Sequence, residues 1–327
     1  MFQYSDALFL SKYRVDKDTF HDICGSISPY CRRSTQRSSP LSPEDVTAIG
    51  LRYFATGTFQ SVVGDTLGFS QPSTHLAIEQ FSTALDDKFN EIIKFPTIDE
   101  QLAGEKQEFY RIGNFPNVIG CVDGTHIPIE KPNIHEQRFV NRKHYHSINV
   151  QGICDSQGKF INVVARWPGS CHDSYILRSS GIWNYMENNP NIGVILGDSA
   201  YPLRSWLMTP IRNPNNRNAA NYNYHHSKTR VIIENTFGRW KRRFPLLKFP
   251  NRRRTIPTIL RDIRVAAVLH NLAIDSRAPD PEDDDDDEHP DNDPDNDCSN
   301  DISAINENLA SHEGTTKRNF ILQNYFS

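Results

Sequence analysis

Two aspartates of the chain each follow a short apolar run, where a charged side chain is unexpected. Asp123 follows VIGCV (118–122), and Asp198 follows VILG (194–197). Both runs have the composition of buried strands, and a carboxylate there costs free energy unless a partner compensates it. A third acid, Glu234, is one position from Ile233 in a helical pattern, so it lies about 100° around that helix from the apolar stripe.

These three acids together are the side chains that a divalent-metal site needs. Carboxylates that meet at one point repel one another, and without a cation at least one becomes neutral. Mg²⁺ and Mn²⁺ prefer such oxygen ligands, and two ions about 4 Å apart can assist phosphodiester cleavage. Singly, each acid has an ordinary alternative: Asp123 in a turn, Asp198 as a helix cap and Glu234 paired with Arg230. Their joint pattern favours the metal site.

A fourth acid, Asp173, lies in WPGSCHDS (167–174) and competes for a place in this site. It is either an additional metal ligand or the N-cap of the helix that follows, and we favour the cap. Arg166 and His172 are nearby in the sequence and are candidates for contacting a phosphate.

The elements that position these acids are predicted from changes of period. Alternating patterns over 118–132, 147–155 and 158–167 predict three strands, with a hairpin at SQG (156–158). Helical spacing returns over 173–189, a short buried strand follows at 194–196, and helices are predicted over 227–247 and 256–275. The order β-β-β-α-β-α puts the three acids on the first strand, the fourth strand and a late helix, which predicts an α/β domain.

The first 95 residues have helical patterns. Ser42 is a plausible N-cap, a short helix over 59–66 ends at Gly68, and Ser70 caps a longer helix with Pro72 in its first turn. Two helices joined by a tight glycine-containing turn predict a helix-turn-helix unit, and a plain helical hairpin is an equal alternative. Residues 96–115 are expected to be a linker.

The acidic charge of the chain is concentrated near its end. Residues 280–301 hold thirteen acidic residues and no Lys or Arg, so a net charge of −4 for the whole chain leaves +9 for the remainder. A basic body favours a polyanion such as DNA as partner, although the same charge also serves solubility. We predict a disordered acidic tail over 278–327.

The densest basic stretch follows Glu234 on the predicted helix and continues beyond it. We predict that its side chains contact the DNA backbone. A nuclear localisation signal is the competing interpretation, and both roles are compatible. The residues are Lys241, Arg242, Arg243, Arg252, Arg253 and Arg254.

Other features limit the class of protein. None of the six cysteines forms a CxxC pair, which is typical of reduced thiols in an intracellular protein. A zinc site built on Cys171 and His172 matches no known ligand spacing. No run of eighteen apolar residues predicts a membrane span, and no signal peptide is recognised. We expect the protein to be located in the nucleus, and a cytoplasmic location is the open alternative. The sequence does not predict the oligomeric state.

Several stretches, in a fixed order, resemble the Harbinger superfamily of DDE transposases and the nucleases derived from it. A further stretch, LRYFATGTFQSVVGDTLGFSQPS (51–73), resembles the helix-turn-helix segment that precedes the catalytic domain, and the likeness spans about residues 10–275. The catalytic stretches are GCVDGTHIPI (120–129), NRKHYHSINVQGICDSQGKF (141–160), WPGSCHDS (167–174), LGDSAYPL (196–203), YNYHHSKTRVIIENTFGRWKRRFPLL (222–247) and VLHNLAI (268–274).

This resemblance implies a ribonuclease H-like fold, here over 116–277, preceded by the helical region over 1–95. It implies a DDE triad of Asp123, Asp198 and Glu234 that binds divalent metal and hydrolyses DNA phosphodiester bonds, with or without strand transfer. It also implies that a separate helical DNA-binding partner protein is common. The sequence departs from the family at His144 and Ala200, where glycine is common, and both changes bear on local backbone geometry.

Two other classes of function compete with a nuclease. The first is a domesticated, non-cutting regulatory protein associated with DNA, against which the intact triad argues. The second is a nucleotide- or sugar-binding α/β protein, which is weakest because the chain lacks a glycine-rich phosphate loop.

Overall fold

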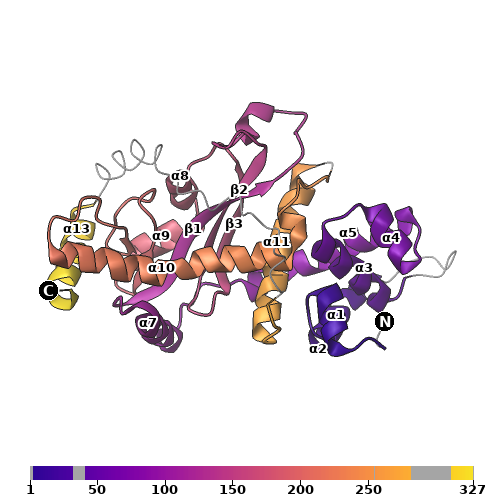
Figure 1. Cartoon of the computed structure of the whole chain (residues 1–327), viewed down its shortest axis with the longest axis horizontal. Helices are drawn as coiled ribbons and strands as arrows, with labels where there is room; N and C mark the ends of the chain where they lie inside the picture. Colours follow the sequence, from indigo (N-terminus) through magenta and orange to yellow (C-terminus); the bar gives the residue numbers. More distant parts are fainter. Residues whose placement is uncertain (1–2, 32–40, 254, 281–310, 327) are drawn as a thin grey trace. The chain divides into compact units, whose positions relative to one another are not determined.

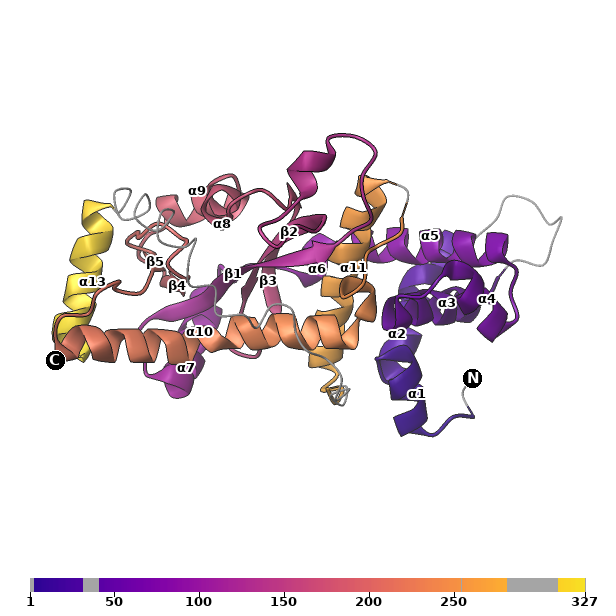
Figure 2. The same cartoon turned by 45° about the horizontal axis from the view of Figure 1, so that its top comes forward.

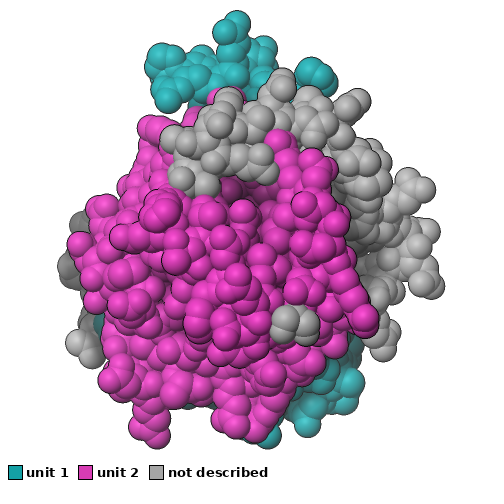
Figure 3. Space-filling model, turned by 90° about the vertical axis from the view of Figure 1, so that its left-hand side faces the viewer, with its two compact units in different colours: residues 1–94, 126–148, 238–283 teal, residues 95–125, 149–237, 284–327 magenta. Residues whose placement is uncertain are grey.

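A computed structural model of the chain describes residues 3–31, 41–253, 255–280 and 311–326. The chain divides into two compact units, coloured teal and magenta in Figure 3. Unit 1 comprises residues 1–94, 126–148 and 238–283, and unit 2 comprises 95–125, 149–237 and 284–327. Each unit is assembled from separate stretches of sequence, so residues 238–275 belong with the N-terminal helices although they lie before the predicted boundary at 277.

Five strands form one sheet in the order β3-β2-β1-β4-β5. Strand β1 pairs in parallel with β4, and β4 pairs in parallel with β5. The first four strands were predicted, whereas β5 has two residues and leaves no period to detect. The strands are β1 (Val118–Pro128), β2 (Ser147–Cys154), β3 (Phe160–Pro168), β4 (Val194–Leu196) and β5 (Leu207–Met208).

Helices cover both faces of this sheet, which makes the fold a mixed α/β one. Figure 2 shows α8 and α9 on one side and α7 and α10 on the other. Buried apolar residues of the sheet, such as Ile119 and Ile195, join those of α8 and α9, such as Leu177 and Met186, in one core cluster. The helices are α7 (Asp99–Gly113), α8 (Asp173–Arg178), α9 (Gly181–Asn188), α10 (Arg217–Arg243) and α13 (His312–Tyr325).

Two expectations for unit 2 were wrong. The predicted linker over 96–115 contains α7, whose Leu102 and Phe109 are buried and whose sequence is otherwise too charged to show a clear apolar stripe. The predicted disordered tail over 278–327 contains α13, which Ser311 caps by accepting from the backbone of Gly314 at 2.9 Å. Residues 281–310 of that tail lie outside the described residues.

Helix α13 is held by a few apolar contacts. Ile321 and Phe326 are 1% and 5% exposed, and the Phe326 ring packs against Phe115, Tyr222 and His225. Figure 1 shows α13 beside the first turns of α10. Ile321 and Phe326 are five positions apart in a short polar segment, so the sequence shows no apolar stripe from which a docked helix could be predicted.

Unit 1 is mainly helical. Its first helices follow the predicted caps: Ser42 forms a capping box with Asp45, Gly68 ends α4 in the left-handed conformation at φ 80°, and Ser70 caps α5. The helices are α1 (Asp6–Tyr13), α2 (Lys17–Ile27), α3 (Pro43–Thr56), α4 (Gln60–Leu67), α5 (Gln71–Asp87), α6 (Phe89–Ile92) and α11 (Ile256–Asp275), with 3-10 helices at Ser28–Cys31, Glu136–Phe139 and Pro245–Leu247.

A buried ion-pair network completes the core of unit 1. Asp262 on α11 is fully buried and accepts from Arg253 at 3.0 Å and from Tyr53 on α3 at 3.2 Å. Arg253 also donates to Glu79 on α5 at 2.6 Å. These bonds tie α11 to α3 and α5. Among the described residues, no helix has the length and apolar character needed to cross a membrane.

Candidate active site

The pairing of β1 with β4 brings two of the predicted acids to the same edge of the sheet. Cys121 on β1 is the partner of Leu196 on β4 in a parallel ladder. Asp123 and Asp198 each lie two residues beyond these partners. Asp198 follows the end of β4, whereas Asp123 lies within β1, just past the last residue of β1 that pairs with β4. The two aspartates are therefore placed by strand register.

Both oxygens of the Asp123 carboxylate accept hydrogen bonds. Oδ1 accepts from the backbone N–H of Gly124 at 2.9 Å, and Oδ2 accepts from Nη1 of Arg230 at 2.8 Å. The Asp123 side chain is 19% exposed. The charged guanidinium thus offsets part of the free-energy cost of placing a carboxylate within a largely buried strand.

Arg230 and Glu234 lie one turn apart on α10, and Arg230 contacts the middle of β1 at Asp123. The second terminal nitrogen of Arg230, Nη2, donates to Glu234. One guanidinium therefore bridges Asp123 and Glu234. Burial lowers the pKa of Arg230, but the carboxylates of Asp123 and Glu234 more than offset this and raise it above its ordinary value, so the side chain is charged.

Asp198 belongs to the same group of charges. Its Oδ1 accepts from the backbone N–H of Ala200 at 2.9 Å, which orders the turn after β4. Burial raises the pKa of Asp123 to about 7, Arg230 opposes this rise, and the nearby charges of Asp198 and Glu234 add to it. The structure thus brings all three predicted acids into electrostatic contact around Arg230.

Asp173 is not the N-cap that we predicted. His172 occupies the cap position of α8, no side chain caps that helix, and Asp173 is its first residue. The Oδ1 of Asp173 accepts from Nδ2 of Asn149 on β2 at 2.9 Å. A Cβ at Gly124 would lie 2.4 Å from the same oxygen, so glycine there lets the carboxylate approach β1. Its role as a fourth metal ligand stays a prediction.

Tyr201 is a residue of this site that the sequence did not reveal. Its side chain is 1% exposed, and its hydroxyl has no hydrogen-bond partner among the residues that the structure describes. Burial, and then the carboxylates of Asp173, Asp123 and Asp198, raise the pKa of Tyr201, so the hydroxyl keeps its proton. The available signal was its position, three residues after Asp198 in the same turn.

The donor set suits a divalent ion, but Arg230 engages it. Carboxylate oxygens are the ligands that Mg²⁺ and Mn²⁺ prefer. Within the described parts of the chain, however, no three His, Cys, Asp or Glu side chains are grouped closely enough to hold a metal ion. The same result leaves the zinc alternative on Cys171 and His172 without support. A metal held by Asp123 and Glu234 would have to exchange contacts with Arg230.

The predicted DNA-backbone residues divide into two kinds. Arg243 is 1% exposed and pairs with Asp280 at 3.0 Å, and Arg253 belongs to the buried network of Asp262. The prediction was wrong for these two, because buried and paired guanidinium groups are not available to phosphate. Lys241 is also buried.

Two predicted residues of this set are more accessible. Arg242 is half-buried, and Arg252 is 49% exposed, lies 3.3 Å from Glu130 and stacks on Phe59 with 4.3 Å to the ring centroid. Arg254 lies outside the described residues. Of the two predicted phosphate contacts in unit 2, Arg166 donates to the carbonyl of Ser179, and His172 occupies the N-cap position of α8 without a capping bond from its side chain.

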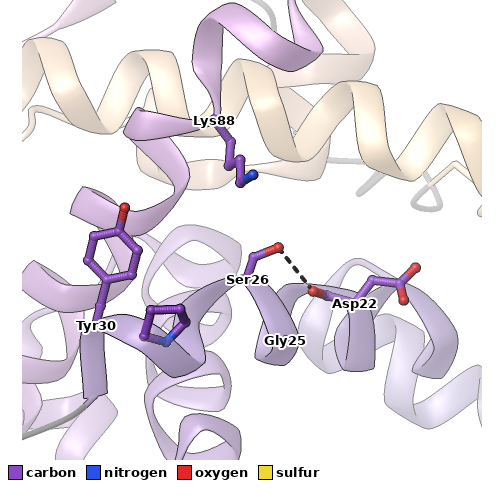
Figure 4. Close-up of a pocket in the computed structure, with 6 residues that line it drawn as sticks. Asp22, Gly25, Ser26, Tyr30 and Lys88 are labelled. Carbon is purple, nitrogen blue, oxygen red and sulfur yellow. Dashed lines mark hydrogen bonds between the residues drawn. The ribbon is translucent and has the colours of Figure 1, made fainter.

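Two surface cavities lie in unit 1, apart from the predicted acids. Figure 4 shows the smaller, of about 550 Å³, with the Lys88 ammonium facing Ser26, whose hydroxyl donates to the carbonyl of Asp22. The larger, of about 890 Å³, is lined by the start of α5 and by the segment that holds Arg252. Neither includes a carboxylate of the predicted triad.

The sequence of the chain matches a known family. Residues 122–271 match the family described as DDE superfamily endonuclease. The Homo sapiens protein named "Putative nuclease HARBI1" is 34% identical over 234 residues, which are 71% of this chain and 67% of that protein. The Xenopus laevis protein of the same name is 33% identical over 74% of the chain and 71% of its own length.

More distant relatives come from a plant. The Arabidopsis thaliana protein named "Antagonist of like heterochromatin protein 1" is 29% identical over 83% of the chain and 74% of its own length. No solved structure shows a significant match. The chain belongs to the DDE superfamily endonucleases, as the resemblance predicted. Within them it is homologous to the HARBI1 and ALP1 proteins.

Proposed function

We propose that the protein is a metal-dependent DNA endonuclease of the DDE type, in which Asp123, Asp198 and Glu234 hold Mg²⁺ or Mn²⁺. The observation that carries the proposal is the grouping of these three acids around Arg230: Asp123 from within β1, Asp198 from the turn after β4 and Glu234 from α10. Such ions, when bound, supply Lewis-acid activation of the attacking and leaving oxygens of a phosphodiester.

The side chains of the chain itself position the groups that react. Strand register fixes Asp123 and Asp198 side by side, so their relative position does not depend on flexible loops. Asn149 orients Asp173, and Gly124 gives that carboxylate room. The part of each acid is to present oxygens toward the same point, where a scissile phosphate is held.

Recognition of DNA is assigned to unit 1 in this proposal. Helices α4 and α5 have the tight turn at Gly68 that a helix-turn-helix needs. Its second helix would display Gln71, Ser73 and His75, and Arg252 lies near its start in the larger cavity. Because this face is hardly basic, a separate helical DNA-binding partner protein is included in the proposal, as is action in the nucleus.

The test is cleavage of plasmid DNA by the purified full chain. Nicking or linearisation with Mg²⁺ or Mn²⁺, its loss with a chelator, and its loss in Asp123→Asn and Glu234→Gln would support the proposal. Lys228→Gln is the matched control, since Lys228 is exposed on the same helix as Glu234. Cleavage that survives in Asp123→Asn would contradict the assignment of the triad.

One observation favours a second function. A relative 29% identical to the chain carries the name "Antagonist of like heterochromatin protein 1" and not the name of a nuclease. The second candidate is therefore a non-cutting, DNA-associated regulator. Binding of DNA without cleavage under both ions, by protein that binds Mn²⁺, would favour it over the nuclease. Strand transfer is an extension of the first function, and joining of labelled ends to a target plasmid tests it.

A further inference from the structure

Arg230 does more than form a pair along one helix. An arginine four residues before a glutamate often pairs with it at the surface, at little gain in stability. Here the same guanidinium also donates to Asp123, which is 107 residues away on β1, and its side chain is only 18% exposed. Its two terminal nitrogens reach two different carboxylates. Arg230 is therefore a cation that bridges two carboxylates.

The contacts of Arg230 occupy oxygens that a metal needs. Asp123 has two carboxylate oxygens, and both already accept hydrogen bonds, from Gly124 and from Arg230. One oxygen of Glu234 accepts from Arg230 as well. A cation bound between Asp123 and Glu234 therefore displaces Arg230 from at least one carboxylate, or shares it at the cost of repulsion between two positive charges.

We propose that Arg230 is the internal counter-cation of this carboxylate cluster and sets its affinity for divalent metal by competing for the same oxygens. The inference rests on the proposed function, because it takes these acids to be the metal ligands. Arg230 stabilises the folded chain by neutralising Asp123 and Glu234. Binding of a metal ion is then an exchange of one cation for another. A change that removes the guanidinium from Asp123 or Glu234 therefore increases the affinity for the metal ion.

The exchange is measured by metal binding rather than by cleavage. Free Mn²⁺ is followed by electron paramagnetic resonance while the full chain is titrated, and melting is recorded with and without Mn²⁺. We expect Arg230→Gln to bind Mn²⁺ about tenfold more tightly than wild type, since a tenfold ratio equals about 1.4 kcal/mol, the low end for hydrogen bonds to charged groups. Without metal it melts lower, and Mn²⁺ raises its melting temperature more.

Matched variants separate the contact from the charge. Lys228→Gln removes one positive charge from an exposed position of the same helix and is expected to bind Mn²⁺ as wild type does. Arg230→Lys keeps the charge but not the two-pronged contact and is expected to fall between wild type and Arg230→Gln. Arg230→Lys also decides the matter if Arg230→Gln does not fold.

The outcomes distinguish this inference from the proposed function. If wild type binds Mn²⁺ and loses it in Asp123→Asn, the metal site stands. Equal or weaker Mn²⁺ binding by Arg230→Lys and Arg230→Gln would then overturn the competition alone. If no variant binds Mn²⁺ at these acids, the proposed metal-dependent function fails, and the inference fails with it.

Discussion

At the scale of single residues, the candidate site is a balance of charges. Three acids meet, and one arginine offsets two of them. The pKa of Asp123 rises to about 7, chiefly through burial, so the cluster holds its charge with difficulty. Substitution of one of these acids is therefore expected to affect cleavage and the free energy of unfolding differently, because strongly shifted pKa values are typical of groups placed for function.

Asp198→Asn tests that separation. We expect it to abolish cleavage while the melting temperature of the metal-free protein stays unchanged or rises slightly, because one charge leaves a group of like charges. The amide can still accept from the backbone of Ala200, so the turn is kept. Thermal denaturation and plasmid cleavage are measured on the same preparation. A large loss of stability would assign Asp198 a structural role.

Tyr201 and Tyr222 are buried tyrosines whose hydroxyl groups differ in hydrogen bonding. Its hydroxyl has no partner among the described residues, whereas the hydroxyl of Tyr222 donates to the carbonyl of Thr209 at 3.0 Å. We expect Tyr222→Phe to lose about 1 kcal/mol of stability and Tyr201→Phe to lose none, because only the first breaks a hydrogen bond.

Activity should show the opposite ranking. If the site uses the Tyr201 hydroxyl, Tyr201→Phe lowers the cleavage rate several-fold and Tyr222→Phe does not. Denaturant unfolding and cleavage rates of the two variants are compared with wild type. Equal rates for Tyr201→Phe and wild type would remove Tyr201 from the site.

The sequence predicts individual site residues where a pattern places them. Asp123 and Asp198 follow apolar runs, and Glu234 flanks an apolar stripe, so their elements were found. The contact between Arg230 and Asp123 has no pattern, because it joins residues 107 positions apart in the chain. Asp173 was misassigned because an acid before a helix looks like a cap, and only packing shows that His172 takes that position.

At the scale of elements, α10 combines site and core. Ile233, Phe237, Trp240 and Phe244 are buried, as their spacing predicted. The helix also carries a buried histidine, His226, whose Nε2 is 3.0 Å from the carbonyl of Met208 on β5. Burial lowers the pKa of His226 to about 4, so it is neutral in the folded chain.

This histidine predicts acid sensitivity. The unfolded chain binds a proton at His226 below about pH 6.5, and the folded chain does so only below about pH 4, so stability is lost as the pH falls between these values. His226→Gln should flatten this part of the pH dependence, by about 2 kcal/mol relative to wild type. Urea unfolding at pH 7.5 and pH 5 measures the difference. Parallel pH profiles would contradict the assignment.

Arg252 and Arg253 are neighbours with different expected roles. Arg253→Ala should cost about 3–5 kcal/mol, because it leaves Asp262 buried without its charged partner. Arg252→Ala should change stability by less than about 0.5 kcal/mol, since its pair with Glu130 is exposed. If Arg252 contacts DNA, its loss lowers the salt slope of DNA binding by about 1.

Unfolding curves and DNA-binding isotherms at two salt concentrations, measured on both variants, test this pair. A stability loss in Arg252→Ala as large as that in Arg253→Ala would contradict the distinction. A cluster of basic residues in the sequence does not reveal which member is buried. The partner of Arg253 is Asp262 on α11, and no sequence pattern predicts that these two residues meet.

Element prediction succeeded where periods were long or caps were clear. Helices α3, α5, α10 and α11 and strands β1 to β4 all have such signals. Strand β5 has only two residues, and α13 has two buried anchors in a polar stretch. Both are fixed by tertiary contacts rather than by local pattern.

At the scale of the whole molecule, the C-terminal region separates into a charged run and a docking helix. Ending the chain at residue 310 removes the buried side chains of Ile321 and Phe326, and we expect a loss of about 3 kcal/mol from the lost apolar burial. Replacing the acids of 280–301 by Asn and Gln should leave stability nearly unchanged and tighten non-specific DNA binding at low salt, because tethered carboxylates compete with phosphate.

Binding isotherms and melting curves of both variants test this division. Unchanged DNA affinity at low salt in the neutralised variant would leave the acidic run only a role in solubility. An unchanged melting temperature after truncation would contradict the contribution of α13.

The discontinuity of unit 1 bears on how such proteins can be rearranged by recombination. Helix α5 packs against α11, and Tyr53 donates to the buried Asp262 of α11, which lies 209 residues further along the chain. A crossover near residue 94 between two relatives would pair each set of N-terminal helices with a foreign α11. Exchange of target preference by shuffling the N-terminal segment alone is therefore expected to yield insoluble chimeras unless residues 238–280 travel with it.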